Sequence, residues 1–244
     1  MSHPAAVSAV LLSGGLDSAV LLADEATRGA VVPVYINVGL AWEAAERSAV
    51  GTLLDALCSL PFGGNIQPLI ALAVPMDDVY SAHHWAMTGR PPAYDTPDED
   101  VYLPGRNVVL LGKAGVYAAA AGVDRLVLGT LGHNPFPDAT PAFRAAMAHS
   151  LSIGLAHPLT IEAPYADVSK TEVIRRGHEL RVPFELTLSC MSPMIGTAVS
   201  RVALHCGTCS KCRERHDAFL DAQVPDPTPY SDLSFVQRGR SSAT

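Results

Sequence analysis

AAVSAVLLSGGLDS, at positions 5–18, opens the first structural unit of the chain. Ala5–Leu12 is a short apolar run that contains β-branched residues, which predicts a β-strand. The run ends at Ser13-Gly14-Gly15, and the pattern of Ala19–Ala26 predicts a helix. A strand, a glycine turn and a helix in this order begin an α/β unit, so we expect a sheet covered by helices.

Strands and helices are predicted to alternate along the rest of the chain. Strands are expected at 31–38, 65–74, 125–129 and 160–163, and helices at 41–57, 106–121, 142–152, 169–180 and 210–222. This order predicts an α/β fold with a doubly wound, mostly parallel five-stranded sheet, Rossmann-like in architecture. Ligands of such sheets bind beyond the carboxyl ends of the strands, and the Gly14 turn lies at one of these ends.

The composition is that of an ordinary globular protein. Of 244 residues, 48% are hydrophobic and 17% are charged, which excludes disorder of the whole chain. The net charge of −7 argues against binding mainly to nucleic-acid phosphates. No apolar run reaches the ~18 residues that span a bilayer, and the first residues lack the basic segment of a signal peptide. We therefore expect a cytoplasmic protein that binds neither nucleic acid nor membrane.

The hexapeptide Ser13–Ser18 has the composition of an anion-binding turn. Its glycines allow a sharp turn and keep side chains away from a ligand. The amides that follow are free because a helix begins there, and the helix dipole adds to their attraction for an anion. Ser13 and Ser18 can donate hydroxyl hydrogen bonds, and Asp17 can hold Mg²⁺ or orient the turn. The alternative is a purely structural turn. The lack of a following lysine excludes a Walker A loop.

Four of the five cysteines are clustered near the C-terminus. Cys206, Cys209 and Cys212 have the spacing C-x2-C-x2-C, and Cys190 precedes them by sixteen positions. Four thiolates suit a tetrahedral, structural Zn²⁺ site. An iron–sulfur cluster and disulfides are the alternatives, and the spacing lacks the final x3-C-P of a bacterial ferredoxin. His205 and His216 are alternative ligands, although we expect them to be solvated.

The hexapeptide SGGLDS resembles the pyrophosphate-binding loop of the PP-loop ATP pyrophosphatases, which have the fold of the adenine nucleotide alpha hydrolases. This resemblance implies that ATP is cleaved between its α and β phosphates and that a substrate oxygen becomes adenylated. A nucleophile then displaces AMP. Physically, the loop would stabilise the pyrophosphate on which negative charge accumulates.

Three further segments are similar to the 7-cyano-7-deazaguanine synthase family, QueC, and the likeness covers residues 6–220. They read YLPGRN at 102–107, IEAPYADVSKTE at 161–172, and TLSCMSP with HCGTCSKCRER at 187–193 and 205–215. The resemblance implies an ATP-dependent ligase that converts 7-carboxy-7-deazaguanine and ammonia to 7-cyano-7-deazaguanine, through an adenylated carboxylate and an amide. The pathway implied is queuosine-type deazapurine biosynthesis. ATP, Mg²⁺, a structural Zn²⁺ and a homodimer are implied as well.

The resemblance also implies roles for individual residues. Asp17 and Lys170 would be catalytic, and Lys170 would neutralise charge that develops on the phosphates. The residues expected to bind ATP are Leu12, Ser13, Gly14, Gly15, Leu16, Asp17, Ser18, Arg106, Asn107 and Gly129. The alternatives are an exposed first-turn lysine at 170, a capping or salt-bridge role for Arg106, and a helix N-cap at Asn107.

Two loops depart from the family pattern. Gly39-Leu40-Ala41-Trp42 stands where the family usually has Gln-Arg-His after an aromatic residue or Asn, and Ala139-Thr140 replaces a Cys-Arg pair. In the second loop Pro137-Asp138 still matches. The residues expected to contact the substrate are His133, Asn134, Phe136 and Asp138, with Phe136 stacking and Asp138 accepting N–H groups. The alternative there is a rigid proline-bracketed turn.

Other functions stay open at this point. The changed loops are compatible with an enzyme that adenylates a related acid or that stops at the amide. A tRNA-modifying sulfurtransferase and a catalytically silent nucleotide-binding protein are further alternatives. The segment 80–102, with His83-His84-Trp85, is either a lid that closes over substrate or a solvated loop.

We expect three parts along the chain. A PP-loop ATP pyrophosphatase domain would occupy 1–187, and a four-cysteine zinc module with its helix would occupy 188–222. An irregular tail would follow at 223–244, after prolines that break regular structure.

Overall fold

A five-stranded parallel sheet forms the centre of the protein. The computed structural model describes residues 7–132, 134–194 and 202–234. The strands are β1 (Ser8–Leu11), β2 (Val31–Asn37), β3 (Ile70–Ala73), β4 (Arg125–Val127) and β5 (Thr160–Glu162). Their order is β3-β2-β1-β4-β5, and every neighbouring pair is parallel. The predicted doubly wound α/β fold is therefore confirmed.

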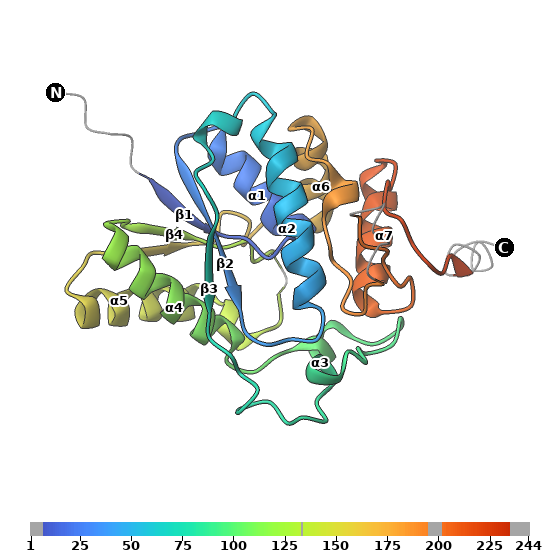
Figure 1. Cartoon of the computed structure of the whole chain (residues 1–244), viewed down its shortest axis with the longest axis horizontal. Coiled ribbons are helices and arrows are strands. Elements are labelled where there is room, and N and C mark those ends of the chain that lie inside the picture. The colour runs from blue at the N-terminus through green and yellow to red at the C-terminus, as the bar shows by residue number, and fades with distance from the viewer. Residues whose placement is uncertain (1–6, 133, 195–201, 235–244) are drawn as a thin grey trace.

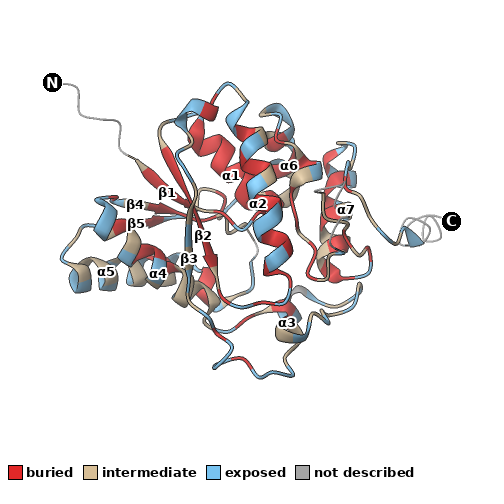
Figure 2. Cartoon of the chain, in the orientation of Figure 1, coloured by how far each residue is buried: buried red, intermediate tan, exposed pale blue. Residues whose placement is uncertain are grey.

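Helices cover both faces of this sheet (Figure 1). One face carries α1 (Leu16–Ala26), α2 (Glu43–Cys58) and α6 (Lys170–Glu179), and the other carries α4 (Arg106–Ala121) and α5 (Pro141–Leu155). The short α3 (Trp85–Thr88) lies beyond the end of β2, and α7 (Ser210–Ala222) packs beside α6. The central strands β1 and β2 are largely buried, whereas the edge strand β3 and the outer helices are partly exposed (Figure 2).

The pleat of β2 divides the core between the two faces. Val32, Val34 and Ile36 belong to the hydrophobic cluster that includes α4, whereas Val31 and Tyr35 belong to the cluster of α1, α2 and α6. Side chains alternate in this way because successive residues of a strand point to opposite faces. Burial on both faces explains why β2 is almost continuously apolar rather than alternating.

The predicted third strand, 65–74, is longer than the real one. A short 3-10 turn spans Gly63–Asn65, and β3 begins only at Ile70. Pro68 lies between them, and a proline has no N–H to donate to a sheet ladder. The helix predicted at 169–180 begins with the predicted capping box, in which Ser169 accepts from Glu172 N and the Glu172 carboxylate accepts from Ser169 N.

The cysteine-rich segment packs directly on the α/β layers. Leu188, Cys190, Cys209 and Cys212 are buried in the same cluster as the strand residues that face α4. Arg215 of α7 is fully buried and donates to Phe184 O at 2.7 Å. Among the described helices, none has the length and apolar character that a membrane span requires.

Candidate active site

A cleft of about 570 Å³ opens at the carboxyl ends of β1, β2 and β4. This volume is in the range of small-molecule and cofactor sites. The cleft brings together most of the residues singled out in the sequence. Those in its lining are Leu12, Ser13, Gly15, Leu16, Asp17, Ser18, Arg106, Asn107, Gly129, Asn134, Phe136, Asp138 and Lys170. Gly14 lies within the same turn, and His133 lies outside the described residues.

The turn at residues 13–15 exposes backbone rather than side chains. Gly14 has φ +78°, and a Cβ built there would lie 2.9 Å from Val50 Cγ2. Gly15 is the N-cap of α1, and no side chain in the described structure caps this helix. The first amides of α1 are therefore available to a ligand, and the helix dipole favours an anion there.

Two serines hold this turn in shape. Ser18 Oγ donates to Gly15 O at 3.0 Å and accepts from Ser13 N at 3.3 Å. Ser13 Oγ accepts from Gly15 N at 3.3 Å. These bonds lie within the turn itself, so the loop is formed before a ligand arrives, which lowers the entropy cost of binding.

Lys170 links the turn to the cysteine-rich segment. Its Nζ lies 2.7 Å from Asp17 Oδ2 and 2.9 Å from Glu214 Oε1. Burial alone would lower the pKa of Lys170, but the charges of Asp17 and Glu214 outweigh burial and its pKa is raised. Lys170 is therefore a paired ammonium in the cleft rather than an exposed first-turn lysine. Asp17 Oδ1 is buried and has no partner among the described residues.

Glu214 and Lys211 come from α7 and were not singled out in the sequence. Burial alone would raise the pKa of Glu214, but Lys170 and Lys211 lower it. Both α7 side chains line the cleft. The signal available in the sequence was their position on either side of Cys212 in the predicted helix, which does not by itself reveal that α7 faces Lys170.

Arg106 and Asn107 begin α4 at the edge of the cleft. Arg106 Nε is buried without a partner in the described part of the chain, and no carboxylate there forms an ion pair with it. Asn107 is not an N-cap, because Gly105 occupies that position. The Asn107 backbone N–H donates to Asp138 Oδ2 at 3.1 Å, and its Nδ2 donates to Asp138 O at 3.1 Å. Asp138 thus ties the loop after β4 to α4.

Two stacked aromatic pairs stand in the cleft wall. Trp42 and Trp85 have ring centroids 5.7 Å apart with an interplanar angle of 4°. Tyr102 and Phe136 have centroids 4.9 Å apart at 27°. All four line the cleft, so the 80–102 segment and both loops that depart from the family pattern contribute to it.

A buried carboxyl group, Glu46, also lines the cleft and was missed in the sequence. Glu46 Oε1 accepts from Trp42 Nε1 at 2.9 Å, and Oε2 accepts from the Tyr35 hydroxyl at 3.3 Å. Burial raises the pKa of Glu46 to about 7, with Arg106 opposing the shift and Glu43 adding to it. The position four residues after Trp42 on one helix was the available signal, since i and i+4 share a helix face.

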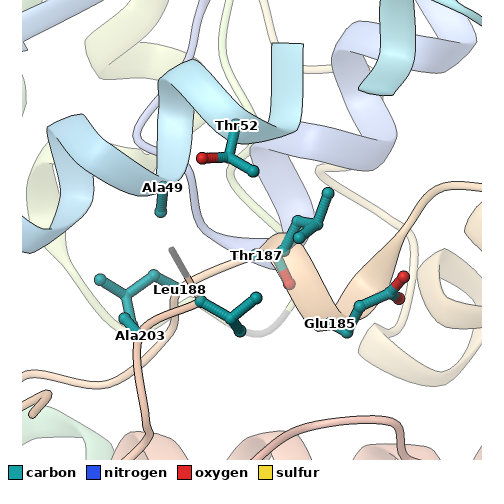
Figure 3. A pocket seen from close by; sticks show the side chains of 8 residues that line it. Ala49, Thr52, Glu185, Thr187, Leu188 and Ala203 are labelled. Carbon is teal, nitrogen blue, oxygen red and sulfur yellow. The ribbon is translucent and has the colours of Figure 1, made fainter. Parts of the chain in front are cut away.

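A second hollow is too small to compete as a ligand site. It lies between α2 and the segment that contains Glu185, Thr187 and Leu188, with a volume of about 10 Å³ (Figure 3). That is close to the smallest space that holds a single water molecule. The cleft is therefore the candidate active site.

The four clustered cysteines form the candidate metal centre. The sulfurs of Cys190, Cys206, Cys209 and Cys212 all lie within 4.8 Å of one another. Sulfurs bound tetrahedrally to one Zn²⁺ lie about 3.8 Å apart, and Cys206 Sγ and Cys212 Sγ are 3.9 Å apart. The cysteines are free thiols, not disulfides. An iron–sulfur cluster divides its thiolates among several irons, so the close approach favours a single ion.

The surroundings of the sulfurs support this assignment. Cys206 N–H donates to Cys190 Sγ at 3.2 Å, and hydrogen bonds from neighbouring thiols lower the pKa of Cys206. Gly207 has φ +78°, and a Cβ there would lie 2.0 Å from Asp232 O, so only glycine fits the knuckle. His205 is fully buried rather than solvated as expected, and its Nε2 accepts from Ser189 N at 3.1 Å. His216 lies beside Asp226, so neither histidine belongs to the cluster.

Removal of one thiolate should release the metal and destabilise the protein. We expect Cys209→Ser to lose one equivalent of zinc and to lower Tm by at least about 8 °C, because structural zinc contributes several kcal/mol to folding. Metal analysis and thermal denaturation measure both effects. Cys58→Ser, at an exposed cysteine outside the cluster, is the control. Stoichiometric iron with acid-labile sulfide in the wild-type protein would contradict the zinc assignment.

Glu46 should make stability depend on pH. Its pKa rises from 4.5 unfolded to about 7 folded, so between these values the folded chain binds more protons and stability falls as pH rises. Above pH 7 the free energy of unfolding is lower than below pH 4.5 by on the order of 3 kcal/mol. We expect Glu46→Gln to raise Tm by several degrees at pH 8 and to leave it unchanged at pH 5. Asp55→Asn, at an exposed site on α2, should show neither effect. Equal Tm values for Glu46→Gln and wild type at both pH values would refute the assignment.

Comparison with known proteins gives the same family along nearly the whole chain. The profile of the family described as "Queuosine biosynthesis protein QueC" matches residues 7–223. The 7-cyano-7-deazaguanine synthase of Anaeromyxobacter dehalogenans (strain 2CP-C) is 32% identical over 240 residues, covering 91% of this chain and 94% of that protein. The 7-cyano-7-deazaguanine synthase of Azoarcus sp. (strain BH72) is 34% identical over 239 residues, covering 91% and 95%.

Among solved structures, the predicted subunit of tRNA methyltransferase from Methanocaldococcus jannaschii DSM has a TM-score of 0.44 at 16% identity, covering 71% of this chain and 75% of its own. That likeness is too weak to bear on fold or function. The family profile, in contrast, spans both the glycine turn and the four cysteines. The chain therefore belongs to the QueC family.

Proposed function

We propose that this protein is an ATP-dependent ligase that converts 7-carboxy-7-deazaguanine and ammonia to 7-cyano-7-deazaguanine in queuosine-type biosynthesis. The observation that carries the proposal is the meeting of the uncapped α1 turn, Lys170 and Arg106 in one cleft. A helix N-terminus and two cations are what a transferring phosphate chain requires. The relatives named as 7-cyano-7-deazaguanine synthases support the choice of acid.

The reaction divides into two adenylations. The carboxylate of the acid attacks the α phosphorus of ATP, and pyrophosphate leaves as the acyl adenylate forms. Ammonia attacks the acyl carbon, a proton is lost, and AMP departs to give the amide. The amide oxygen then attacks the α phosphorus of a second ATP and a second pyrophosphate leaves. Elimination of AMP, with loss of the two N–H protons, gives the nitrile.

The turn and the residues around it each have a role in this reaction. The amides of Leu16 to Ser18 hold the pyrophosphate, and Lys170 neutralises the charge that develops as the α–β bond breaks. Gly129 lies against the start of α1, where a Cβ would stand 3.5 Å from Ser18 N, and leaves backbone open beside the phosphates. Arg106 binds an anion with the guanidinium that no carboxylate of the described structure occupies.

Asp17 is suited to a Mg²⁺ ion. Its Oδ2 is paired with Lys170, while Oδ1 is buried and unpartnered among the described residues. A carboxylate oxygen is the ligand that Mg²⁺ prefers in nucleotide sites. When bound there, the ion would supply positive charge to the phosphates.

The loop after β4 is proposed to border the acid. Asn134 and Phe136 line the cleft, and Phe136 is stacked on Tyr102. Asp138 is engaged by Asn107, so we assign it to holding this loop in place as well as to substrate contact. The cysteine module at 188–222 contributes by carrying Lys211 and Glu214 to the cleft.

Loss of the Lys170 charge should abolish adenylation without unfolding the protein. We expect Lys170→Gln to lower pyrophosphate release by 100-fold or more, since it removes charge stabilisation aimed at the leaving group. The assay supplies ATP, Mg²⁺, ammonium and 7-carboxy-7-deazaguanine, and mass spectrometry follows acid, amide and nitrile. Lys113→Gln, an exposed lysine on α4, is the control. Accumulation of the amide alone would identify an enzyme that stops at the amide. Pyrophosphate release that requires tRNA would favour a tRNA-modifying sulfurtransferase.

The protein is further proposed to work as a cytoplasmic homodimer. The free thiols of the metal centre favour a reducing compartment, where ATP is also available. Helix α5 reads PAFRAAMAHSLSIGL, yet only Arg144 of it is buried. On this side of the sheet Val116 is 54% exposed and Ile153 is 68% exposed. A second copy offers the same apolar face, so an isologous contact would cover both.

A charge on this face should separate the protomers. Ile153→Glu is expected to shift the molecular mass in light scattering from two chains to one, because it places a carboxylate against an apolar partner. Asp55→Lys, on the opposite face of the sheet, should leave the mass unchanged. A wild-type protein that is monomeric at micromolar concentration would show the proposed interface to be wrong.

A further inference from the structure

One wall of the cleft carries a carboxyl group that the phosphate chemistry does not use. Glu46 is 7% exposed and lines the cleft from α2. Its oxygens accept one hydrogen bond each, from Trp42 and Tyr35. A carboxylate has about four acceptor positions, so about half of its capacity is open to a ligand. The neighbouring Glu43 differs, because both of its oxygens accept backbone N–H groups of Val38 and Gly39 at 2.8 Å.

The same wall is flat and aromatic. The chain has two tryptophans, and both are found here, stacked on each other and lining the cleft. Trp42 is held by Glu46, and Trp85 is only partly buried. A planar heterocycle packs well against such a surface, and the adjacent carboxylate gives it a preferred edge.

Nothing in the described structure neutralises Glu46 directly. Arg106 is the cation that acts on it, but the two form no ion pair, and Arg106 Nε has no partner within the described residues. If Glu46 served only to balance Arg106, the two groups would be in contact. An acceptor and a cation therefore both remain available to a ligand that carries N–H donors and an anionic group.

We propose that Glu46, Trp42 and Trp85 form the subsite that recognises the ring of the acid substrate, with the Glu46 carboxylate accepting adjacent N–H groups of a guanine-type edge. The ionised carboxylate only accepts hydrogen bonds, and two N–H donors brought by a ligand favour this form over the neutral acid. A guanine-type ring presents a ring N–H beside an exocyclic amine, whereas adenine presents a donor beside an acceptor. Glu46 thus selects the acid over the adenine of ATP. The assignment rests on the proposed function and adds the residue that reads the ring.

The two tryptophans provide a direct test by fluorescence. Titration with 7-carboxy-7-deazaguanine in the absence of ATP should quench the tryptophan emission of the wild-type protein. Glu46→Gln should weaken this binding about 10-fold to 100-fold, the range for a hydrogen bond to a buried charged group. The KM for ATP should change less than about twofold. Asp55→Asn, on the same helix, should bind like the wild type.

An analogue of the acid without the exocyclic amine sharpens the test. Wild type should bind this analogue about 10-fold more weakly than the acid itself, and Glu46→Gln should bind the two almost equally. Equal weakening of both ligands would show that Glu46 does not read the amine, and it would overturn the proposal. Quenching by ATP with none by the acid would place adenine at this wall and would overturn it as well.

Failure of the proposal and failure of the proposed function give different results. Turnover of the acid to nitrile without any change in tryptophan emission would leave the function standing and reject the subsite. Quenching by the acid that Glu46→Gln abolishes, in a protein that releases no pyrophosphate with it, would support the subsite and reject the function. Circular dichroism and Tm confirm that each variant is folded.

Discussion

The steric constraint at Gly14 underlies the whole cleft. Its positive φ and its contact with Val50 admit no side chain, and the chain therefore enters α1 with bare backbone. Because no side chain caps α1, the first amides of the helix face the cleft. A capped helix would satisfy these donors internally and would have nothing to offer a phosphate. The loss of a cap costs stability, typically about 1 kcal/mol, and here it leaves the amides available to the anion of the proposed function.

The cysteine module is fastened to this turn at several points. Leu188 N–H donates to Gly14 O at 2.8 Å, so the segment entering the module holds the turn. Glu214 holds Lys170 beside Asp17, and the buried Arg215 donates to Thr187 Oγ1 at 2.8 Å and to Phe184 O. A metal that orders the start of α7 therefore also orders the charges around the phosphate turn. We infer that the metal takes no part in the reaction but helps to fix the positions of the charged side chains in the cleft.

Local patterns in the sequence predicted the strands and helices, the glycine turn and the clustering of the four cysteines. The strand and helix periods, the glycine pair and the C-x2-C-x2-C spacing are each properties of neighbouring residues, so they are visible without a structure. The start of β3 was misplaced because the effect of Pro68 on pairing depends on where its partner strand lies. Glu214 and Glu46 were missed because their roles arise from contacts with Lys170 and with the cleft, which lie far away in sequence or on another element.

Glu46 illustrates how a cost in stability points to function. A carboxyl group whose pKa is raised by burial weakens the fold at neutral pH, and Gln would make the same bond from Trp42 without that cost. A residue that only filled the core would not need to be charged. The charge is useful only if something brings hydrogen-bond donors to it, and Glu46 lines the cleft from which such donors would come. Trp42 stands in the loop that departs from the family pattern. In the proposed subsite, the ring of the acid is read by a wall that differs from that pattern, while the glycine turn and the cysteines keep it.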